Sequence, residues 1–371
     1  MTALQKTLAI AAALACLATL APPFALGATG SVRVWDFWPV AVFLIVALAA
    51  LAWFRRGMPP AVSGTLAIAG AIILLTTLRA ITLGDWGFWL LLVAVWCFAW
   101  LFAERLAADI ARGDATRRAG FLIPLLFGAS ILVLWEAVTI GAGVERVLLP
   151  PPSAIWQRLI SSVSLLAADF QQTFLKAVLI GYALGCGSAF LVAIAIDRSP
   201  FLKRGLLPLG SFISALPLIG IAPIMVMWFG FDWPSKAAVV VIMTFFPMLV
   251  NTIAGLNASG QMERDMMRTY AAGYWQTLFK LRLPAAAPFI FNALKINSTL
   301  ALIGAIVSEF FGTPIVGMGF RISSEIGKLR VDMVWAEIAV AAVAGSAFYG
   351  VVVLIERAVT FWHPSVRGGR A

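Results

Sequence analysis

The chain contains long, uncharged apolar stretches, and the clearest of them reads AAVVVIMTFFPMLVNTIAGL at residues 237–256. A membrane-spanning helix needs about 20 consecutive, predominantly apolar residues. A charge near the centre of such a helix costs about 2.5–3.5 kcal/mol on insertion, so spans exclude charged side chains. This stretch therefore predicts a transmembrane helix.

The whole chain shares this character, since 62% of its residues are hydrophobic and only 12% are charged. Soluble domains carry roughly 45–50% apolar and about 25% charged residues. Nine further apolar runs can be marked: 8–26, 38–54, 62–83, 86–102, 121–140, 173–196, 207–229, 285–308 and 335–361. We therefore expect an all-α integral membrane protein with about ten transmembrane helices.

Lysine and arginine gather in short clusters between alternate apolar runs, at Lys6, 55–56, 105–118, 198–204, 264–282 and 367–370. Cytoplasmic loops of membrane proteins are enriched in these residues. The intervening loops are poorer in them; the loop with Arg321, Lys328 and Arg330 fits least well. This pattern predicts a multi-pass membrane protein with both termini in the cytoplasm.

The titratable residues argue against several other classes of protein. The net charge of +10 is explained by the loop clusters, so we expect no nucleic-acid partner. The single histidine, His363, and the isolated Cys16, Cys97 and Cys186 form no metal-binding spacing. The sequence has no GxxxxGK[ST] phosphate loop. We expect no catalytic, metal or cofactor site in this chain, and therefore no enzyme.

The first apolar run has two interpretations. Lys6, an apolar stretch and small residues at 25–28 resemble a cleaved signal peptide, although the run is long for one. The alternative, which we favour, is a retained helix. Residues 1–104 are expected to form two extra hairpins to which we assign no function, followed by a basic cytoplasmic linker at 105–120. A six-helix domain at 121–362 and a cytoplasmic tail at 363–371 complete the chain.

The segment 257–284 is the most informative loop. Helical spacing places one set of apolar residues on one face: Met267, Tyr270, Ala271, Tyr274, Trp275 and Leu278. Polar residues such as Asp265, Arg268 and Gln276 fall opposite. Gly273 is expected to divide the segment into two short helices, and Pro284 to end the second. Such a hairpin either lies on lipid or docks onto a cytosolic partner.

This loop resembles the conserved cytoplasmic loop of ABC importer permeases, which reads EAA, three residues, G, nine residues, then I-x-L-P. Asp265 takes the Glu place, Ala271 the Gly place, and Leu283 and Pro284 complete the end. Met266 and Met267 replace the two alanines, and Leu281 replaces Ile. Residues 148–156, 215–230, 245–256 and 302–309 resemble further segments of the nitrate/sulfonate/taurine branch, so the likeness covers about 121–362.

The resemblance implies a coupling helix that fits a groove on a separate cytosolic ABC ATPase dimer, which uses the ATP. The docking residues it implies are Asp265, Arg268, Ala271, Ala272, Gly273, Trp275, Leu283 and Pro284. It also implies a place in the bacterial inner (plasma) membrane, an extracytoplasmic solute-binding protein and a permease homodimer, with pairing to a second permease left open. Members of the branch carry nitrate, sulfonates, bicarbonate or vitamin-precursor heterocycles, and the binding protein largely sets the specificity.

A few polar residues inside the runs are candidates for lining the solute pathway: Ser211, Ser214, Asn251, Asn297, Ser298 and Glu309. We add Pro217, which with Pro223 interrupts a span and frees backbone carbonyls. The alternative interpretation is hydrogen bonding between helices, with Glu309 reaching water. The pathway has no arginine cluster for an anion, which favours a neutral or heterocyclic solute.

Two further expectations concern the bundle itself. Gly181 and Gly185 have the small-xxx-small spacing that lets helices approach closely, and Lys295 is expected to reach the cytoplasmic surface. An ATP-independent secondary transporter or channel is the main alternative function. It needs intramembrane ionisable groups and internal repeats. The only candidates for intramembrane ionisable groups are Glu136, Lys295 and Glu309, and internal repeats are not evident in the sequence.

Overall fold

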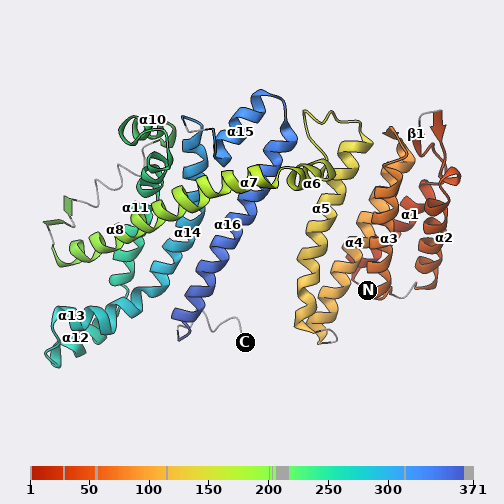
Figure 1. Ribbon diagram of the computed structural model, residues 1–371. Helices are drawn as coiled ribbons and strands as arrows, with labels where there is room; N and C mark the ends of the chain where they lie inside the picture. The colour runs from red at the N-terminus through yellow and green to blue at the C-terminus, as the bar shows by residue number, and fades with distance from the viewer. Residues whose placement is uncertain are drawn as a thin grey trace. The chain divides into compact units, whose positions relative to one another are not determined.

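The computed structural model describes residues 2–27, 30–54, 57–113, 116–199, 201–202, 204–205, 217–312 and 315–362. His363 and the predicted tail lie outside these residues. The described chain is almost entirely helical (Figure 1), which confirms the expected all-α membrane protein. It divides into two compact units, Met1–Gln157 and Arg158–Ala371, and each is described by itself.

Each predicted apolar run contains a helix among the residues that the structure describes. Within the described residues, seven helices are long and apolar enough to cross a membrane: Pro60–Thr77, Trp86–Arg112, Ala119–Gly141, Val163–Arg198, Trp233–Leu256, Tyr274–Glu309 and Val331–Val359. Three runs give shorter apolar helices at Ala3–Ala18, Trp38–Trp53 and Gly220–Phe229. The run 207–229 falls partly outside the described residues.

The first unit is a helical bundle with a small sheet. Its helices are α1 (Ala3–Ala18), α2 (Trp38–Trp53), α3 (Pro60–Thr77), α4 (Trp86–Arg112) and α5 (Leu122–Gly141), with short 3-10 turns η1 (Val34–Asp36) and η2 (Arg117–Phe121); α6 (Pro152–Ser161) crosses the unit boundary. The strands β1 (Ala25–Gly27), β2 (Gly30–Val32) and β3 (Leu83–Gly84) pair antiparallel in the order β2-β1-β3.

The first helix is shorter than its apolar run. It ends at Ala18, and Pro22 and Pro23 lead into β1 because proline has no N–H to continue a helix. Leu8, Ala12 and Cys16 are buried in the core of the unit, where α1 packs against α4. The interpretation of α1 as a retained helix stays a prediction.

The boundary between the compact units does not coincide with a boundary expected from the sequence. The first unit continues to Gln157 and includes α5, which packs against α4 and α3. The sequence placed residues 121–140 with the six-helix domain instead. The division into 1–104, 105–120 and 121–362 stays a prediction.

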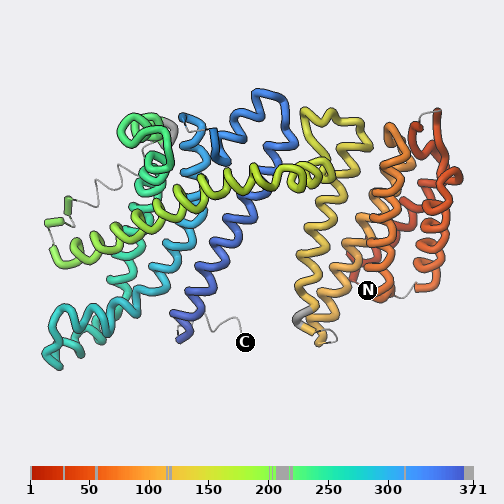
Figure 2. The backbone as a smooth tube through the Cα atoms, in the orientation of Figure 1, coloured from red at the N-terminus to blue at the C-terminus, as the bar shows by residue number. Residues whose placement is uncertain are grey.

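The second unit holds the long helices that surround the candidate site. Its elements are α7 (Val163–Phe170), η3 (Gln171–Val178), α8 (Leu179–Arg198), α10 (Leu218–Phe229), α11 (Trp233–Leu256), α12 (Gln261–Thr269), α13 (Tyr274–Thr277), η4 (Leu278–Arg282), α14 (Leu283–Glu309), α15 (Met318–Gly327) and α16 (Val331–Val359). Within this unit, the α12–α13 hairpin lies at the end opposite α10 and α15 (Figures 1 and 2).

Two long helices are continuous through π-helical turns. Residues Val163–Arg198 and Tyr274–Glu309 each form one run of helix, with π geometry at η3 and η4. The prediction that Pro284 ends a helix is wrong. Pro284 follows the wider turn of η4 at the start of α14, where its missing N–H does not interrupt the helix.

The predicted glycine contact between helices is confirmed. A Cβ on Gly181 would lie 2.6 Å from Val240 Cβ and 2.8 Å from the Ala237 carbonyl oxygen. Gly185 approaches the Val241 backbone in the same way, with a Cβ position 3.0 Å from Val241 Cα. The spacing of four residues therefore brings the backbones of α8 and α11 together because both glycines lack a side chain.

Gly181→Ala should destabilise the protein by about 1–3 kcal/mol, because the added methyl group meets backbone atoms that cannot move aside. Thermal unfolding in detergent measures the change. Gly187→Ala is the matched control on α8, since a Cβ there meets no described atom within 4 Å. Equal unfolding temperatures for the two variants would contradict the close contact.

Candidate functional site

The segment with the motif forms a helical hairpin, as the sequence indicates. α12 ends at Thr269 and α13 begins at Tyr274, so the break falls around Gly273 as expected. Helix α12 has no buried side chain. Tyr270 is 79% exposed and Trp275 is 51% exposed, because the turn between the helices separates residues that one continuous helix would place on a common buried face.

The turn itself depends on a backbone conformation that favours glycine. Ala271 has φ of 52°, in the left-handed region that L-residues adopt at a cost of roughly 1–2 kcal/mol. The N–H of Ala271 donates to the Arg268 carbonyl and that of Ala272 to the Met267 carbonyl, both at 2.9 Å. These two bonds form a Schellman motif. Ala271 occupies the position that the motif of the resemblance gives to glycine, for this conformational reason.

A buried ion pair fastens the hairpin to a membrane helix. Arg282 donates from Nη1 and Nη2 to the two carboxylate oxygens of Asp197, at 2.7 and 2.6 Å. The Tyr274 hydroxyl donates to the same carboxylate at 3.0 Å. The two charged side chains are only 12% and 9% exposed. Such bidentate, charge-assisted pairs are strong and directional, so the base of the hairpin is fixed to the end of α8.

Further contacts hold the same region to α11. Arg282 Nε donates to the Leu256 carbonyl at 3.0 Å, and Arg264 Nη2 to the same oxygen at 3.3 Å. Both arginines thereby satisfy a carbonyl at the end of α11, where no helical N–H remains to bind it. The Arg198 guanidinium lies 5.4 Å from the centroid of the Tyr274 ring, which adds a cation–π contact.

The predicted docking residues divide into an exposed group and a partly buried group. Asp265, Arg268, Ala271, Gly273 and Trp275 are exposed, whereas Ala272, Leu283 and Pro284 are partly buried. The Asp265–Arg268 pair, at 3.3 Å, is surface-exposed and contributes little stability. Trp275 keeps a tertiary contact, with the Arg198 guanidinium 5.8 Å from its ring centroid, and the docking role of the exposed residues stays a prediction.

At the opposite end of the unit, other segments supply the acceptors for the start of α15. The N-cap residue Gly317 has no side chain that could cap α15. The N–H groups of Gly317, Met318 and Gly319 nevertheless all have acceptors. Gly317 donates to Asp169 at 2.6 Å, Met318 to Thr173 at 2.8 Å and Gly319 to Glu309 at 2.7 Å. Carboxylates are favourable at a helix N-terminus, where unpaired N–H groups carry partial positive charge.

We call Asp169, Thr173, Glu309 and the first residues of α15 the α15 cluster. It also contains charged side chains that the sequence analysis did not propose as site residues. Arg321 donates from Nε to Asp169 at 2.8 Å, and Asp169 is fully buried. Glu337 of α16 is 0% exposed, and neither of its carboxylate oxygens has a hydrogen-bond donor among the described residues. Asp169 and Thr173 are one helical turn apart, but Arg321 is 152 positions from Asp169, so no local spacing indicated the cluster.

Lys236 joins the start of α11 to the segment after α14. Its ammonium group is buried, at 1% residue exposure, and donates to the carbonyls of Phe231 and Gly312. Next to it, Asp232 caps α11 by accepting from the Trp233 N–H at 2.7 Å. This bond, and then the bond from the Gln172 amide, lowers the pKa of Asp232 below its ordinary value.

The predicted pathway residues that the structure describes each have identifiable hydrogen-bond partners or positions. Ser211 and Ser214 lie outside the described residues. Asn297 is 0% exposed and donates to the Thr244 carbonyl at 2.7 Å, and Ser298 bonds within its own helix. Asn251 donates to the Pro247 carbonyl. These bonds fit the alternative of hydrogen bonding between or within helices, and the pathway role of the three residues stays a prediction.

The remaining predicted residues have specific environments. Pro217 is exposed at the N-cap of α10. Glu309 is 2% exposed and accepts from the Thr173 hydroxyl at 2.8 Å as well as from Gly319. It therefore does not reach water but belongs to the α15 cluster. Lys295, expected to extend to the surface, is paired with Glu356 of α16 at 2.9 Å.

The second unit combines long apolar helices with an exposed hairpin at one end and a buried polar cluster at the other. Comparison with known sequences identifies the family. Residues 181–367 match the family model described as binding-protein-dependent transport system inner membrane component. The chain belongs to this family of inner-membrane transport permeases, which is not a family of enzymes.

For several known relatives, most of the relative's own length aligns with this chain. A probable ABC transporter permease protein of Haemophilus influenzae is 31% identical over 215 residues, covering 58% of this chain and 87% of that protein. The formylaminopyrimidine transport permease protein ThiX of Halalkalibacterium halodurans is 30% identical, covering 65% and 96%. The putative aliphatic sulfonates transport permease protein SsuC of Bacillus subtilis is 28% identical, covering 71% and 95%.

Asp197→Ala should destabilise the protein by about 3 kcal/mol, because it leaves the buried Arg282 without its anionic partner. Hydrogen exchange should accelerate in residues 261–282. Asp265→Ala is the matched control, because it removes a carboxylate from an exposed pair and should cost less than about 1 kcal/mol. Unchanged exchange in the Asp197 variant would show that the ion pair does not fix the hairpin.

Proposed function

We propose that the chain is the transmembrane permease subunit of an ATP-binding-cassette importer for a small solute. The α12–α13 hairpin carries this proposal: it is exposed at its turn and rigidly fastened at its base. A coupling element needs both properties, because it must be accessible to a partner and must transmit the partner's motion to the membrane helices. A helix lying passively on lipid needs no such fastening.

The hairpin is proposed to dock onto a cytosolic ATPase dimer, which binds and hydrolyses the ATP. This assignment puts the hairpin end of the second unit in the cytoplasm. Both termini of the chain are also proposed to be cytoplasmic, because of the positive charges near them in the sequence. The α15 end then faces an extracytoplasmic solute-binding protein. A permease homodimer is the proposed assembly. The family match supports these partners in general, and the positive charge of the hairpin loop supports its cytoplasmic side.

The solute is proposed to come from the nitrate, sulfonate and taurine class or from heterocyclic vitamin precursors. Relatives named for formylaminopyrimidine, aliphatic sulfonates and taurine support this range. Among the described residues, Asn251, Asn297, Ser298 and Glu309 have their polar groups bonded within the protein. Selection of the solute is accordingly proposed to reside mainly in the binding protein.

Reconstitution in liposomes tests the function. The chain is combined with its candidate ATPase and solute-binding protein, and uptake of taurine, an aliphatic sulfonate and formylaminopyrimidine is measured with and without ATP. We expect ATP-dependent uptake of one of these solutes, and ATPase activity that rises when the permease is present. ATP-independent uptake by the chain alone would instead identify a secondary transporter or channel.

Substitutions at a single position test the hairpin. Ala271→Glu places a charged side chain at the exposed turn and should abolish stimulation of the ATPase without changing the unfolding temperature of the permease. Ala271→Gly is the matched control, because glycine adopts the φ of 52° without strain; it should retain full coupling. Full stimulation by the Ala271→Glu variant would contradict docking at this turn.

A further inference from the structure

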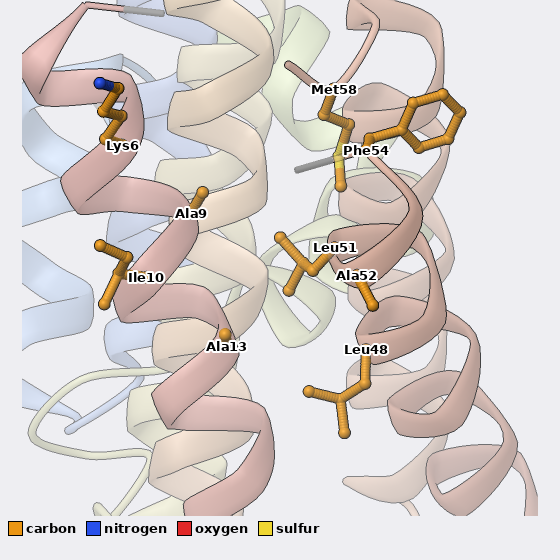
Figure 3. A pocket seen from close by; sticks show the side chains of 9 residues that line it. All are labelled: Lys6, Ala9, Ile10, Ala13, Leu48, Leu51, Ala52, Phe54 and Met58. Atoms are coloured by element: carbon orange, nitrogen blue, oxygen red, sulfur yellow. The ribbon is translucent and has the colours of Figure 1, made fainter. Parts of the chain in front are cut away.

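The first unit contains an apolar groove between α1 and α2, and the family match does not include it (Figure 3). Its volume is about 440 Å³, within the range of roughly 300–1,000 Å³ typical of small-molecule sites. Ala9 and Ala13 line it from α1, and Leu48 and Leu51 from α2. The two alanines are one helical turn apart, and their small side chains leave the groove open.

One end of the groove is basic. Figure 3 shows Lys6 at the same end as Phe54 and Met58, with Ala13 and Leu48 further along. Lys6 is exposed. In the sequence, Arg55 and Arg56 directly follow Phe54.

A second cation lies beside this end. Gln5, the neighbour of Lys6, donates to the carbonyl of Glu104, the neighbour of Arg105, at 3.5 Å. The Arg105 guanidinium also lies against Gly57, since a Cβ there would be 3.0 Å from Arg105 Nη2. Met58, which follows Gly57, lines the groove. The two cations therefore belong to the same end of the bundle.

Two donor atoms of the Arg105 side chain lack hydrogen-bond acceptors among the described residues. Its Nε and Nη2 atoms are enclosed, and neither has a hydrogen-bond acceptor in the described parts of the chain. Enclosed donors are rarely left unpaired in proteins, so each such case requires an explanation. Of the neighbouring carboxylates on α4, Asp109 is already paired with Arg112 at 2.5 Å. A bound anion that Arg105 reaches by a small rotation of its flexible side chain would satisfy these donors.

We propose that this groove binds one anionic phospholipid. An acyl chain lies between α1 and α2 along Ala9, Ala13, Leu48 and Leu51, and the phosphate binds Lys6 and Arg105. The apolar length of the groove fits a hydrocarbon chain, and its basic end fits a phosphate. Basic pockets at the cytoplasmic ends of membrane helices are suited to anionic headgroups. A zwitterionic lipid with the same acyl chain fills the groove, but its headgroup has no net negative charge to balance Lys6 and Arg105.

Native mass spectrometry of the full-length chain in detergent tests this site. Phosphatidylglycerol and phosphatidylcholine with identical acyl chains are titrated separately. We expect one phosphatidylglycerol to bind at least about tenfold more tightly than phosphatidylcholine. The double variant Lys6→Gln, Arg105→Gln should bind both lipids equally and weakly. Ala13→Phe, which fills the groove, should weaken both lipids while the preference between headgroups remains.

A matched double variant controls for charge. Arg33→Gln with Arg79→Gln removes two cations from the other ends of α2 and α3, since Arg33 precedes α2 and Arg79 follows α3. This variant should bind phosphatidylglycerol as the natural chain does. Equal binding of the two lipids to the natural chain, or an unchanged preference in the Lys6 and Arg105 variant, would overturn the proposal. An equal loss in both double variants would show attraction by net charge alone, and would overturn it too.

Discussion

The hydrocarbon interior of a bilayer offers no hydrogen-bond partner to a peptide group, and this constraint shapes the second unit. Every backbone N–H and carbonyl at membrane depth must be satisfied within the protein. Long helices meet the requirement along their length but not at their ends. Where they end, side chains supply the missing groups: Asp169, Thr173 and Glu309 accept from the start of α15, while Arg282 and Arg264 donate to the last carbonyl of α11.

The same requirement explains why charged side chains are buried in so apolar a protein. Lys236 donates to the carbonyls of Phe231 and Gly312, so its burial secures the segments on either side of it. Asp197 similarly gathers Tyr274 and Arg282. In both places a charge is tolerated away from water because several partners satisfy it at once. Glu337 differs, since its buried oxygens have no donor within the described residues.

The spans were predictable because charges are costly to insert into a membrane. Each span therefore shows up in the sequence as about 20 apolar residues with few or no charges. The hairpin was predictable because its break at Gly273 and its motif are local. The continuous helix through Pro284 was not, because the π-helical turn at η4 has no reliable sequence signal. The α15 cluster was also missed apart from Glu309. Asp169 and Arg321 meet across 152 positions, and no local spacing encodes such a contact.

The unbroken helix from Tyr274 to Glu309 has a mechanical consequence. At a rise of 1.5 Å per residue its 36 residues extend roughly 54 Å. Sharp bending of such a rod requires a local defect in its hydrogen bonding. Its first residue is held by Asp197 and its last by Gly319. The π-helical turn η4 and Pro288 are such defects, and both lie toward the Tyr274 end. Beyond Pro288, a tilt of the helix is therefore carried to its far end as a displacement of the Glu309 carboxylate relative to α15, so that this part of the helix acts as a stiff lever.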